Sequence, residues 1–465
     1  MHYDAIIIGA GMAGLAAGIR LGMYDKKVLI LEKHLIPGGL NSYYQRRNFD
    51  SGGLRHFDVG LHALTNYIKK GEKAKPFSKL LKQLRLSYDD FKLHPQSYSV
   101  VQFGQTKLTF TNEFNHYYQE IVSQFPLEKN GLDFLLEKIK SHDELKLESG
   151  YVSSRSVLDQ FLKDPLLKEM LLAPLLIYGS AWENDMDFSQ FVIMFKSIYQ
   201  EGFSRPEGGV RTIIKLLMAK LDELKVEIKF KTPVLEIIQK DGVAIGVRTQ
   251  DGEYFSKQIF SSAGLPETMM LAKSEHETPK VGKLSFVESL FVTKKKLAVQ
   301  DFAPTIVFYN KGAAYAYEKP KTLFDPKSAV VCFPDHYELE NKTGEGMIRV
   351  THMANFDLIS ELKKEDYLLF KKTVEENALS IIKEVCPSFN EEIVFTDTFT
   401  PLTIKKFTSH FEGVVYGSED KLKDGVTSCK NLFIIGTDQG FLGIVGALLS
   451  GVSMANLHGL MESPT

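Results

Sequence analysis

Short apolar runs separated by helical patterns mark both ends and the middle of this chain. Ala5 to Ile8 form a continuous apolar run, which is typical of a strand buried on both faces of a parallel sheet. An apolar helical segment follows, and Val28 to Leu31 form a second such run. This order predicts a βαβ unit at the N-terminus.

The middle and the end of the chain repeat this style. A helical pattern spans 210–224 and precedes three short predicted strands, 226–230, 234–238 and 243–249. Asp241-Gly242 and Asp251-Gly252 are typical of hairpin turns. An apolar strand is predicted at 258–264, and the last 35 residues hold a strand at 432–435 and an apolar helix from about 444 to 457.

The segments between these regions have different patterns. Residues 67–204 are predicted to be mostly helical, and residues 276–395 are mixed. We therefore expect an α/β protein with a discontinuous Rossmann-type domain formed by 1–66, 205–275 and 396–465. A second, mixed α+β substrate domain is expected to comprise 67–204 and 276–395.

Glycines follow the first strand at the spacing G-x-G-x-x-G. Gly9 allows a tight turn, Gly11 lets the backbone approach a pyrophosphate, and Gly14 lets the helix pack closely on the sheet. Glu32 ends the second apolar run, and its carboxylate suits the 2′-hydroxyl of an adenosine ribose. An ordinary tight loop would explain the glycines alone, but the complete βαβ context favours a dinucleotide site that also includes Ala10, Met12 and Ala13.

Composition narrows the class of protein further. The chain has 465 residues, 44% hydrophobic and 25% charged, and a formal net charge of −2, which disfavours nucleic-acid partners. Cys332, Cys386 and Cys429 are far apart, so we expect buried thiols in a reducing, cytoplasmic compartment and no metal site. No apolar run approaches the ~18 residues of a membrane-spanning helix.

Taken together, the motifs resemble those of the phytoene desaturase, carotenoid isomerase and retinol saturase group of FAD-dependent oxidoreductases. The resemblance spans the whole chain. It rests on Gly9-Ala-Gly-Met-Ala-Gly14, Leu31-Glu-Lys33, Pro37-Gly-Gly39, Phe57-Asp-Val-Gly60, Pro206-Glu-Gly-Gly209, Thr400-Pro-Leu-Thr403, Ile434-Ile-Gly-Thr-Asp438 and Gly446-Ala-Leu-Leu-Ser-Gly451.

The resemblance implies an FAD cofactor and a set of binding residues. Glu32 and Lys33 would lie at the adenosine ribose, Gly39 and Leu40 at the pyrophosphate and flavin edge, and the backbone of Val234 at the adenine. Asp438 would contact the ribityl or pyrophosphate portion, although Thr437 separates it from the preceding glycine. Independently, the N-terminus of a helix at Gly443 and Ile444 suits the negative charge of a reduced flavin.

Two related phrases precede the candidate catalytic histidine, His62. They are Phe49-Asp-Ser-Gly52 and Phe57-Asp-Val-Gly60, so either Asp50 or Asp58 holds the family position, with Gly52-Gly53 as a hairpin tip between them. His62 is a weak candidate, because a structural histidine is compatible with the same spacing. No other catalytic side chain is predicted, since hydride transfer through flavin N5 requires none.

The family resemblance predicts a lipophilic, isoprenoid or carotenoid-like polyene that is desaturated, saturated or isomerised. The apolar segments 171–178 and 188–199 would line a tunnel for it or form ordinary core. Two other functions share this fold: an amine or amino-acid oxidase, and a non-catalytic prenyl-protein escort resembling the GDP-dissociation inhibitors.

Residues 69–85 combine basic side chains with an apolar stripe. Phe77, Leu80, Leu81 and Leu84 follow helical spacing, and seven of the seventeen residues are Lys or Arg. Such a helix lies on an anionic bilayer, as a peripheral membrane contact, or packs its apolar stripe into the substrate domain.

Overall fold

The first of two seven-stranded sheets joins the two ends and the middle of the chain. The computed structural model describes residues 2–48, 52–147, 150–274, 278–297, 302–337 and 344–461. The strand order of this first sheet is β10-β11-β12-β1-β2-β9, with β18 paired to β12. The strands are β1 His2–Ile8, β2 Val28–Leu31, β9 Glu227–Lys229, β10 Val234–Lys240, β11 Val243–Thr249, β12 Gly252–Ser261 and β18 Leu432–Ile434. Strands β9, β2, β1, β12 and β18 run parallel, and this confirms the predicted βαβ unit and the strands that join it from the middle and the end.

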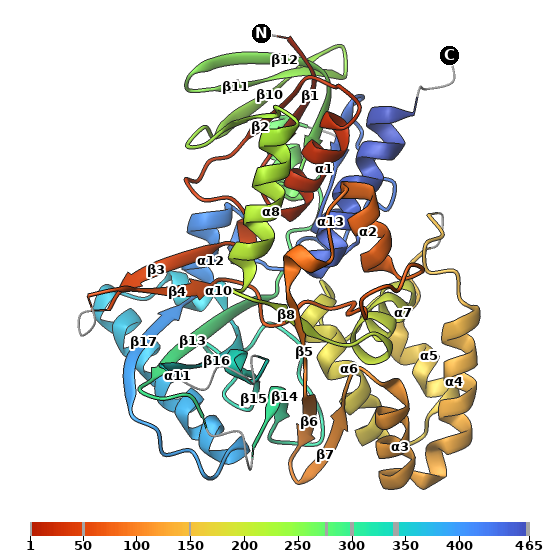
Figure 1. The fold of residues 1–465 in the computed structure, drawn as a ribbon, viewed down its shortest axis with the longest axis vertical. Coiled ribbons are helices and arrows are strands. Elements are labelled where there is room, and N and C mark those ends of the chain that lie inside the picture. The colour runs from red at the N-terminus through yellow and green to blue at the C-terminus, as the bar shows by residue number, and fades with distance from the viewer. Residues whose placement is uncertain are drawn as a thin grey trace.

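Helices from three parts of the sequence pack on this sheet. They are α1 Met12–Gly22, α2 Pro76–Leu84, α8 Val210–Glu223 and α13 Gly443–Met454, the last continuing as a π-helical turn, Ala455–Leu460. Helix α1 contacts the other three, and α9 Leu265–Leu271 belongs to the apolar cluster on the other face. Figure 1 shows this layered unit at the top of the molecule, with both chain ends on it.

The second sheet lies below the first in Figure 1 and is mainly antiparallel. Its order is β17-β13-β16-β15-β14-β6-β7, with bounds Tyr98–Phe103 (β6), Thr106–Phe110 (β7), Ser285–Thr293 (β13), Pro304–Asn310 (β14), Ser328–Cys332 (β15), Gly346–Ala354 (β16) and Ile393–Phe399 (β17). Strands β6 and β7 come from the segment that was predicted to be mostly helical. β6 pairs in parallel with β14, so its partner lies about 200 residues later in the chain.

Helices cover both faces of the second sheet. On one face lie α3 Phe114–Gln124, α4 Lys129–Ser141, α5 Ser154–Phe161, α6 Pro165–Gly179 and α7 Phe188–Phe195, which continues as the π-helical turn Lys196–Gln200. Helix α11 Lys364–Val385 packs on the other face, and α10 Phe356–Ser360 and α12 Pro401–Thr408 lie near the junction of the two sheets. Most of 171–178 and 188–199 is fully buried core.

Two short two-stranded sheets complete the fold. Strands β3 Tyr43–Arg47 and β4 Leu54–Asp58 are antiparallel, and the Asn48 N–H donates to the Gly53 carbonyl at the predicted tip. β5 Leu93–Pro95 pairs with β8 Ser204–Pro206. Asp50 lies outside the described residues, whereas Asp58 is buried at the end of β4.

Helix α2 packs on the layered unit of the first sheet and not on the second sheet, where the substrate domain was predicted. Its apolar side chains Phe77, Leu80, Leu81 and Leu84 are buried against α1 and α13. The prediction that this stripe packs into the substrate domain is therefore wrong, and the same burial removes the stripe from contact with a bilayer. The basic side chains of α2 remain on its outer side.

The C-terminal helix is longer than the apolar runs in the sequence suggested. By length and composition, Gly443–Leu460 would suffice to cross a membrane, because α13 and the π-helical turn after it are continuous. Half of this stretch is buried within the protein, so its length and composition alone are weak evidence of a membrane span.

Candidate functional site

A cavity of about 460 Å³ is lined by residues of both sheets and of the loops between them. Eleven of the predicted cofactor-binding residues line it: Gly9, Gly11, Met12, Ala13, Glu32, Lys33, Gly39, Leu40, Val234, Gly443 and Ile444. The candidate catalytic residue His62 lines it too. The fold therefore brings together residues that are up to about 430 positions apart.

The glycine motif forms the floor of the cavity at the end of β1. A side chain at Gly14 would overlap the carbonyl oxygen of Gly9, so this glycine serves close packing inside the protein. Gly11 precedes α1 in extended backbone, and a methyl group added to it would have no described atom within 4 Å. The Gly38 N–H donates to the Ala10 carbonyl at 2.8 Å and brings the Pro37-Gly38-Gly39 loop beside this space.

The carboxylate of Glu32 is held at the edge of the cavity by backbone groups. Its Oε2 accepts from the Ala10 N–H at 2.7 Å, and its Oε1 accepts from the His34 N–H at 2.8 Å. The residue is only 8% exposed, and what is exposed faces the cavity. A fixed acceptor after the second strand is the group that binds an adenosine ribose in dinucleotide sites. Ala10 contributes through this contact, not by lining the cavity.

Lys33 closes the same end of the cavity against α12. Its Nζ donates to the Lys406 carbonyl at 3.2 Å and to the Ser409 hydroxyl. Burial lowers the pKa of Lys33.

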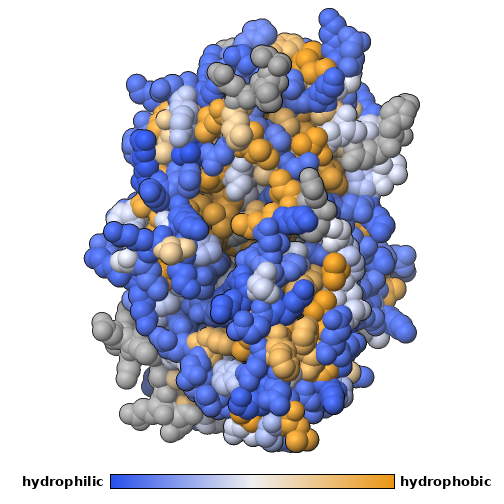
Figure 2. Space-filling view, turned by 90° about the vertical axis from the view of Figure 1, so that its right-hand side faces the viewer, coloured by the Kyte–Doolittle hydropathy of each residue, from blue (hydrophilic) through white to orange (hydrophobic). Residues whose placement is uncertain are grey.

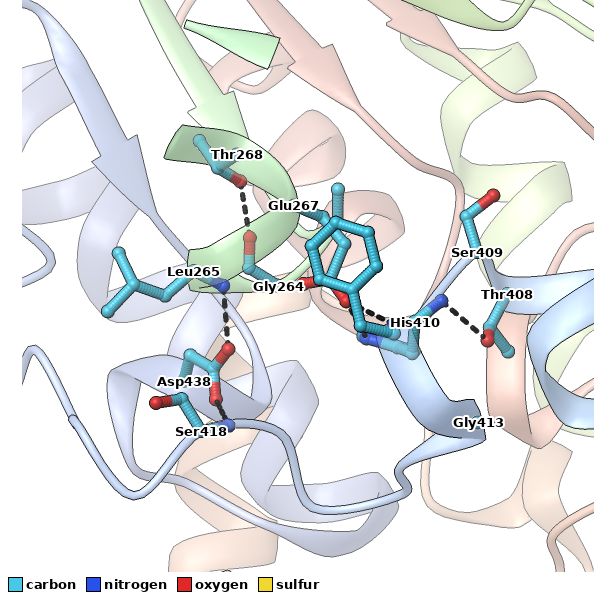
Figure 3. A network of polar contacts seen from close by, with 12 residues as sticks. Gly264, Leu265, Glu267, Thr268, Thr408, Ser409, His410, Gly413, Ser418 and Asp438 are labelled. Carbon is cyan, nitrogen blue, oxygen red and sulfur yellow. Dashed lines mark hydrogen bonds and ion pairs between the residues drawn. The ribbon is translucent and has the colours of Figure 1, made fainter. Parts of the chain in front are cut away.

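Asp438 is committed to contacts within the protein, as Figure 3 shows. Its Oδ2 accepts from the Leu265 N–H at 2.6 Å, and its Oδ1 accepts from the Ser418 N–H at 2.8 Å and from Lys421 at 3.0 Å. The neighbouring Thr437 lines the cavity, and Asp438 does not. The Asp438 carboxylate thus links the start of α9 to Ser418 and Lys421 and does not face the cavity.

Glu267 and His410 line the cavity near this network and were not predicted. The Glu267 Oε1 accepts from the Phe411 N–H at 2.6 Å and lies 3.6 Å from the His410 Nδ1. The two residues come from α9 and from the turn after α12, which meet only in the folded protein. Their separation in sequence left no local signal for the pair.

A buried polar cluster lies where the cavity enters the second sheet. Glu288 on β13 accepts from the His62 Nε2 at 2.9 Å and from the Thr351 hydroxyl at 2.8 Å, and its other oxygen accepts from the Arg349 Nε at 2.6 Å. Burial would raise the pKa of Glu288, but Arg349 and His62 outweigh it and lower the pKa to about 2. For His62, burial would lower the pKa, but interactions with the Cys332 side chain and the Glu288 carboxylate outweigh it and raise the pKa to about 9. We call these four residues, His62, Glu288, Arg349 and Thr351, the junction cluster.

The loop that carries His62 is held by two buried arginines. The Leu61 carbonyl accepts from Arg205 at 3.1 Å and from Arg349 at 2.8 Å. Arg205 also pairs with Asp58, whose Oδ1 accepts from the Val210 N–H at the start of α8 at 3.2 Å. The phrases Phe57-Asp-Val-Gly60 and Pro206-Glu-Gly-Gly209 therefore pack together and fix the position of His62.

Beyond the junction cluster, the wall of the cavity is mostly apolar. It is formed by Ile177, Tyr178, Met194, Phe286, Val330, Val415 and Tyr416, and we call this part the inner chamber. Only three of these residues, Ile177, Tyr178 and Met194, come from the two segments considered for a tunnel. The Tyr178 hydroxyl is buried and has no hydrogen-bond partner among the described residues.

Among the described residues, no three His, Cys, Asp or Glu side chains form a group that could hold a metal ion. Cys332, Cys386 and Cys429 are free and buried, as predicted.

Comparisons with known proteins agree with this geometry. Residues 7–84 match the model of the NAD(P)-binding Rossmann-like domain. The chain is 26% identical to prolycopene isomerase of Daucus carota and 22% identical to all-trans-retinol 13,14-reductase of Danio rerio, with 98% of this chain and 80% and 85% of those proteins covered. Over nearly its whole length, the chain is similar to members of the FAD-dependent carotenoid desaturase and isomerase family. A match to phytoene desaturase of Pseudescherichia vulneris, 24% identical over 55% of this chain and 54% of that one, fits the same family.

Solved structures show the family fold in proteins of diverse function. An oxidoreductase from Methanosarcina mazei has a TM-score of 0.68 at 15% identity, covering 98% of this chain and all of that one. A putrescine oxidase variant gives 0.61 at 14% identity, with 98% of both chains covered. Rab GDI from Plasmodium falciparum gives 0.56 at 13% identity, with 99% of both chains covered.

Proposed function

We propose that this protein binds FAD and uses it to desaturate, saturate or isomerise a lipophilic isoprenoid polyene. One observation carries the proposal: a single cavity joins the glycine motif and Glu32 to the apolar inner chamber. A cofactor on the first part and an apolar chain in the second would meet beside the junction cluster. The prolycopene isomerases, retinol reductases and phytoene desaturase among the relatives support this class of substrate.

The residues present fit an FAD molecule. Gly11 leaves open space for a pyrophosphate, Glu32 supplies the ribose acceptor, and the free N–H groups at the start of α13 suit negative charge on a flavin. A bound flavin supplies hydride exchange at N5, while the protein positions the substrate and excludes water. The proposed FAD-binding domain comprises 1–66, 205–275 and 396–465 together with helix α2 of the first insert, and the rest of the two inserts forms the substrate domain.

The lining of the inner chamber argues against an amine oxidase. The neighbouring carboxylate, Glu288, already accepts hydrogen bonds from His62, Thr351 and Arg349. An ammonium substrate would therefore lack a free anionic partner among the described residues of this chamber. An escort protein without cofactor leaves the open space at Gly11 and the fixed Glu32 unexplained.

Absorption spectroscopy of the purified protein tests the cofactor. Yellow protein with flavin bands, or apoprotein that regains them with FAD, is expected; colourless protein that does not take up FAD would refute the proposal. Anaerobic mixing of reduced or oxidised holoprotein with polyenes, with amines as the comparison, then follows the flavin bands and product formation. Turnover of amines but not polyenes would favour the oxidase.

We also propose that a peripheral, electrostatic membrane contact gives access to such a substrate. Lys73, Lys79, Lys82 and Arg85 are exposed on or beside α2, and they form no ion pair within the described residues. Figure 2 shows this side of the molecule, with apolar residues gathered around a hollow at mid-height and hydrophilic residues around them. Because the apolar stripe of α2 is buried, the contact would depend on charge alone.

A further inference from the structure

A second, much smaller cavity adjoins the inner chamber. It measures about 10 Å³ and lies between α6 and the second sheet, which are packed against each other (Figure 1). Its lining includes Ala173 and Ile177 of α6, Phe103 of β6, Phe308 of β14 and Val330 of β15. Two of these residues, Ile177 and Val330, also line the inner chamber. Their side chains therefore separate the two cavities, and we call the pair the partition.

The register of the second sheet places the two cavities along one row of residues. Glu288 on β13 lies opposite Thr351 on β16, Thr351 lies opposite Val330 on β15, and Val330 lies opposite Phe308 on β14. Directly opposite residues of antiparallel strands point to the same face of the sheet. The row thus leads from the junction cluster to the partition and then to the second cavity. An extended chain that starts beside the junction cluster and follows this row meets the partition first.

The second cavity suits hydrocarbon. The side chain of Asn310, which also lines it, already donates to the carbonyls of Gly312 at 2.8 Å and Ala314 at 3.0 Å. Most of the remaining lining is aromatic or aliphatic. A buried water needs two to four polar partners, whereas apolar cavities stay dry and accept apolar ligands.

The partition is closed and held in place. Ile177 is 5% exposed and Val330 is 2% exposed, and the carbonyl of Ile177 accepts from the Tyr416 hydroxyl at 2.5 Å. Forcing extra methylene groups into a packed core is unfavourable. A chain that reaches the partition is therefore stopped there, although unfilled space lies behind it.

We propose that Ile177 and Val330 limit the length of the hydrocarbon chain that the inner chamber accepts. The inference rests on the proposed function and adds selection by chain length to it. Neighbouring strands lie about 4.8 Å apart, so an open path from β15 to β14 would lengthen the chamber by about that distance. This is close to the length of one extended isoprene unit, and the limit should therefore move by one unit when the partition is opened.

Ile177→Ala tests the inference, because it removes most of one side chain of the partition. Holoprotein is titrated by calorimetry with all-trans isoprenoid hydrocarbons that differ by one isoprene unit. Wild type should show a fall in affinity beyond a limiting length. Ile177→Ala should raise the affinity for the first excluded length by about tenfold or more, which corresponds to about 1.4 kcal/mol and to the burial of about two further CH₂ groups. Ile177→Val removes one methyl group and should change the affinity in the same direction to a smaller extent, even if Ile177→Ala folds poorly.

Two further variants distinguish an opened path from a weakened core. Ala173 lies one turn before Ile177 and lines the second cavity alone, so Ala173→Leu added to Ile177→Ala fills that cavity at nearly constant core volume and should remove most of the gain. Ile198→Ala is the matched control. Ile198 is fully buried in the same apolar cluster but lines neither cavity, so its loss should lower the Tm and keep the wild-type length limit.

The outcomes separate the length limit from the proposed function. An unchanged limit in both Ile177 variants, or the same shift in Ile198→Ala, would overturn the inference while leaving the polyene substrate in place. Equal affinity of wild type for every length would do the same. Holoprotein that binds no isoprenoid of any length would refute the proposed substrate class, and the length limit with it.

Discussion

Substitution of Gly11 by alanine separates cofactor binding from folding. Gly11 has extended backbone, with φ −71° and ψ 176°, which alanine adopts without strain. Apart from its two chain neighbours, no described residue has an atom within 4 Å of the added methyl group. The apoprotein should therefore keep its stability or gain up to about 1 kcal/mol, because alanine restricts the unfolded chain. The methyl group would, however, occupy the space that a pyrophosphate needs.

The expected loss of FAD affinity follows from the hydrogen bonds that the phosphates would forfeit. Each bond to a charged group contributes about 1.5–3 kcal/mol, so the loss of one corresponds to roughly 10- to 150-fold weaker binding. The assay is titration of apoprotein with FAD, followed by flavin fluorescence, combined with urea unfolding of the apoprotein. Wild-type FAD affinity in Gly11→Ala would refute this account of the site.

Substitutions at two other glycines serve as controls for Gly11→Ala. A methyl group at Gly14 would overlap the Gly9 carbonyl, so Gly14→Ala should destabilise the apoprotein by about 1–3 kcal/mol, the usual range for overpacking. Gly312 also has open space around it and lies in the exposed turn after β14. Gly312→Ala should leave FAD affinity unchanged and affect stability by no more than the same gain of up to about 1 kcal/mol, which identifies any loss of FAD affinity at Gly11 as a local effect.

Three further predictions concern charged groups. Arg349→Met should cost about 3–5 kcal/mol in urea unfolding, because it leaves Glu288 buried without its cation, and Glu288→Gln in the same chain should recover part of that loss. Since the pKa of Glu288 is lowered to about 2, its contribution to stability is present above its ordinary pKa of 4.5 and is lost as the pH falls towards 2. The pKa of His62 is raised from 6.5 to about 9, so the contribution of His62 to stability is full below pH 6.5 and is lost as the pH rises through 9. His62→Gln should therefore flatten the fall in stability between pH 6.5 and 9, and an unchanged slope would contradict the assignment. Replacing Lys73, Lys79, Lys82 and Arg85 by glutamine should abolish sedimentation with anionic vesicles and leave neutral vesicles unaffected, and wild-type sedimentation would show that α2 makes no electrostatic contact.

The nucleotide-binding unit was predictable because its signals are local. Gly9, Gly11 and Gly14 stand between two apolar runs, and each glycine answers a steric need within a few residues. The same is true of Asp241-Gly242, where both residues have positive φ at the turn between β10 and β11. Short-range sterics of this kind leave a pattern in the sequence itself.

Long-range pairing left weaker patterns. Strand β6 forms a local hairpin with β7, but its parallel pairing with β14 joins segments about 200 residues apart. The antiparallel register that sets Glu288 opposite Thr351 and Leu290 opposite Arg349 joins segments about 60 residues apart. Glu288 did carry one signal, because it is a lone carboxylate in the otherwise uncharged run Ser285–Thr293. A charged side chain in a buried strand requires a partner or a function, but the sequence does not show which residue is the partner of Glu288.

The fold alone does not decide the function, because a putrescine oxidase and a Rab GDI share it. The residues that distinguish these functions must lie where the two sheets meet, because the glycine motif and the sheets themselves are common to members of the fold. In this chain the junction cluster lies at the meeting point, and the buried groups Asp58, Arg205 and Arg349 fix the loop that carries His62 to the cavity. Burying three ionised groups there would be unfavourable for packing alone, and a well-packed apolar core of equal volume would be at least as stable. The arrangement is therefore better explained by a function at this junction than by stability alone.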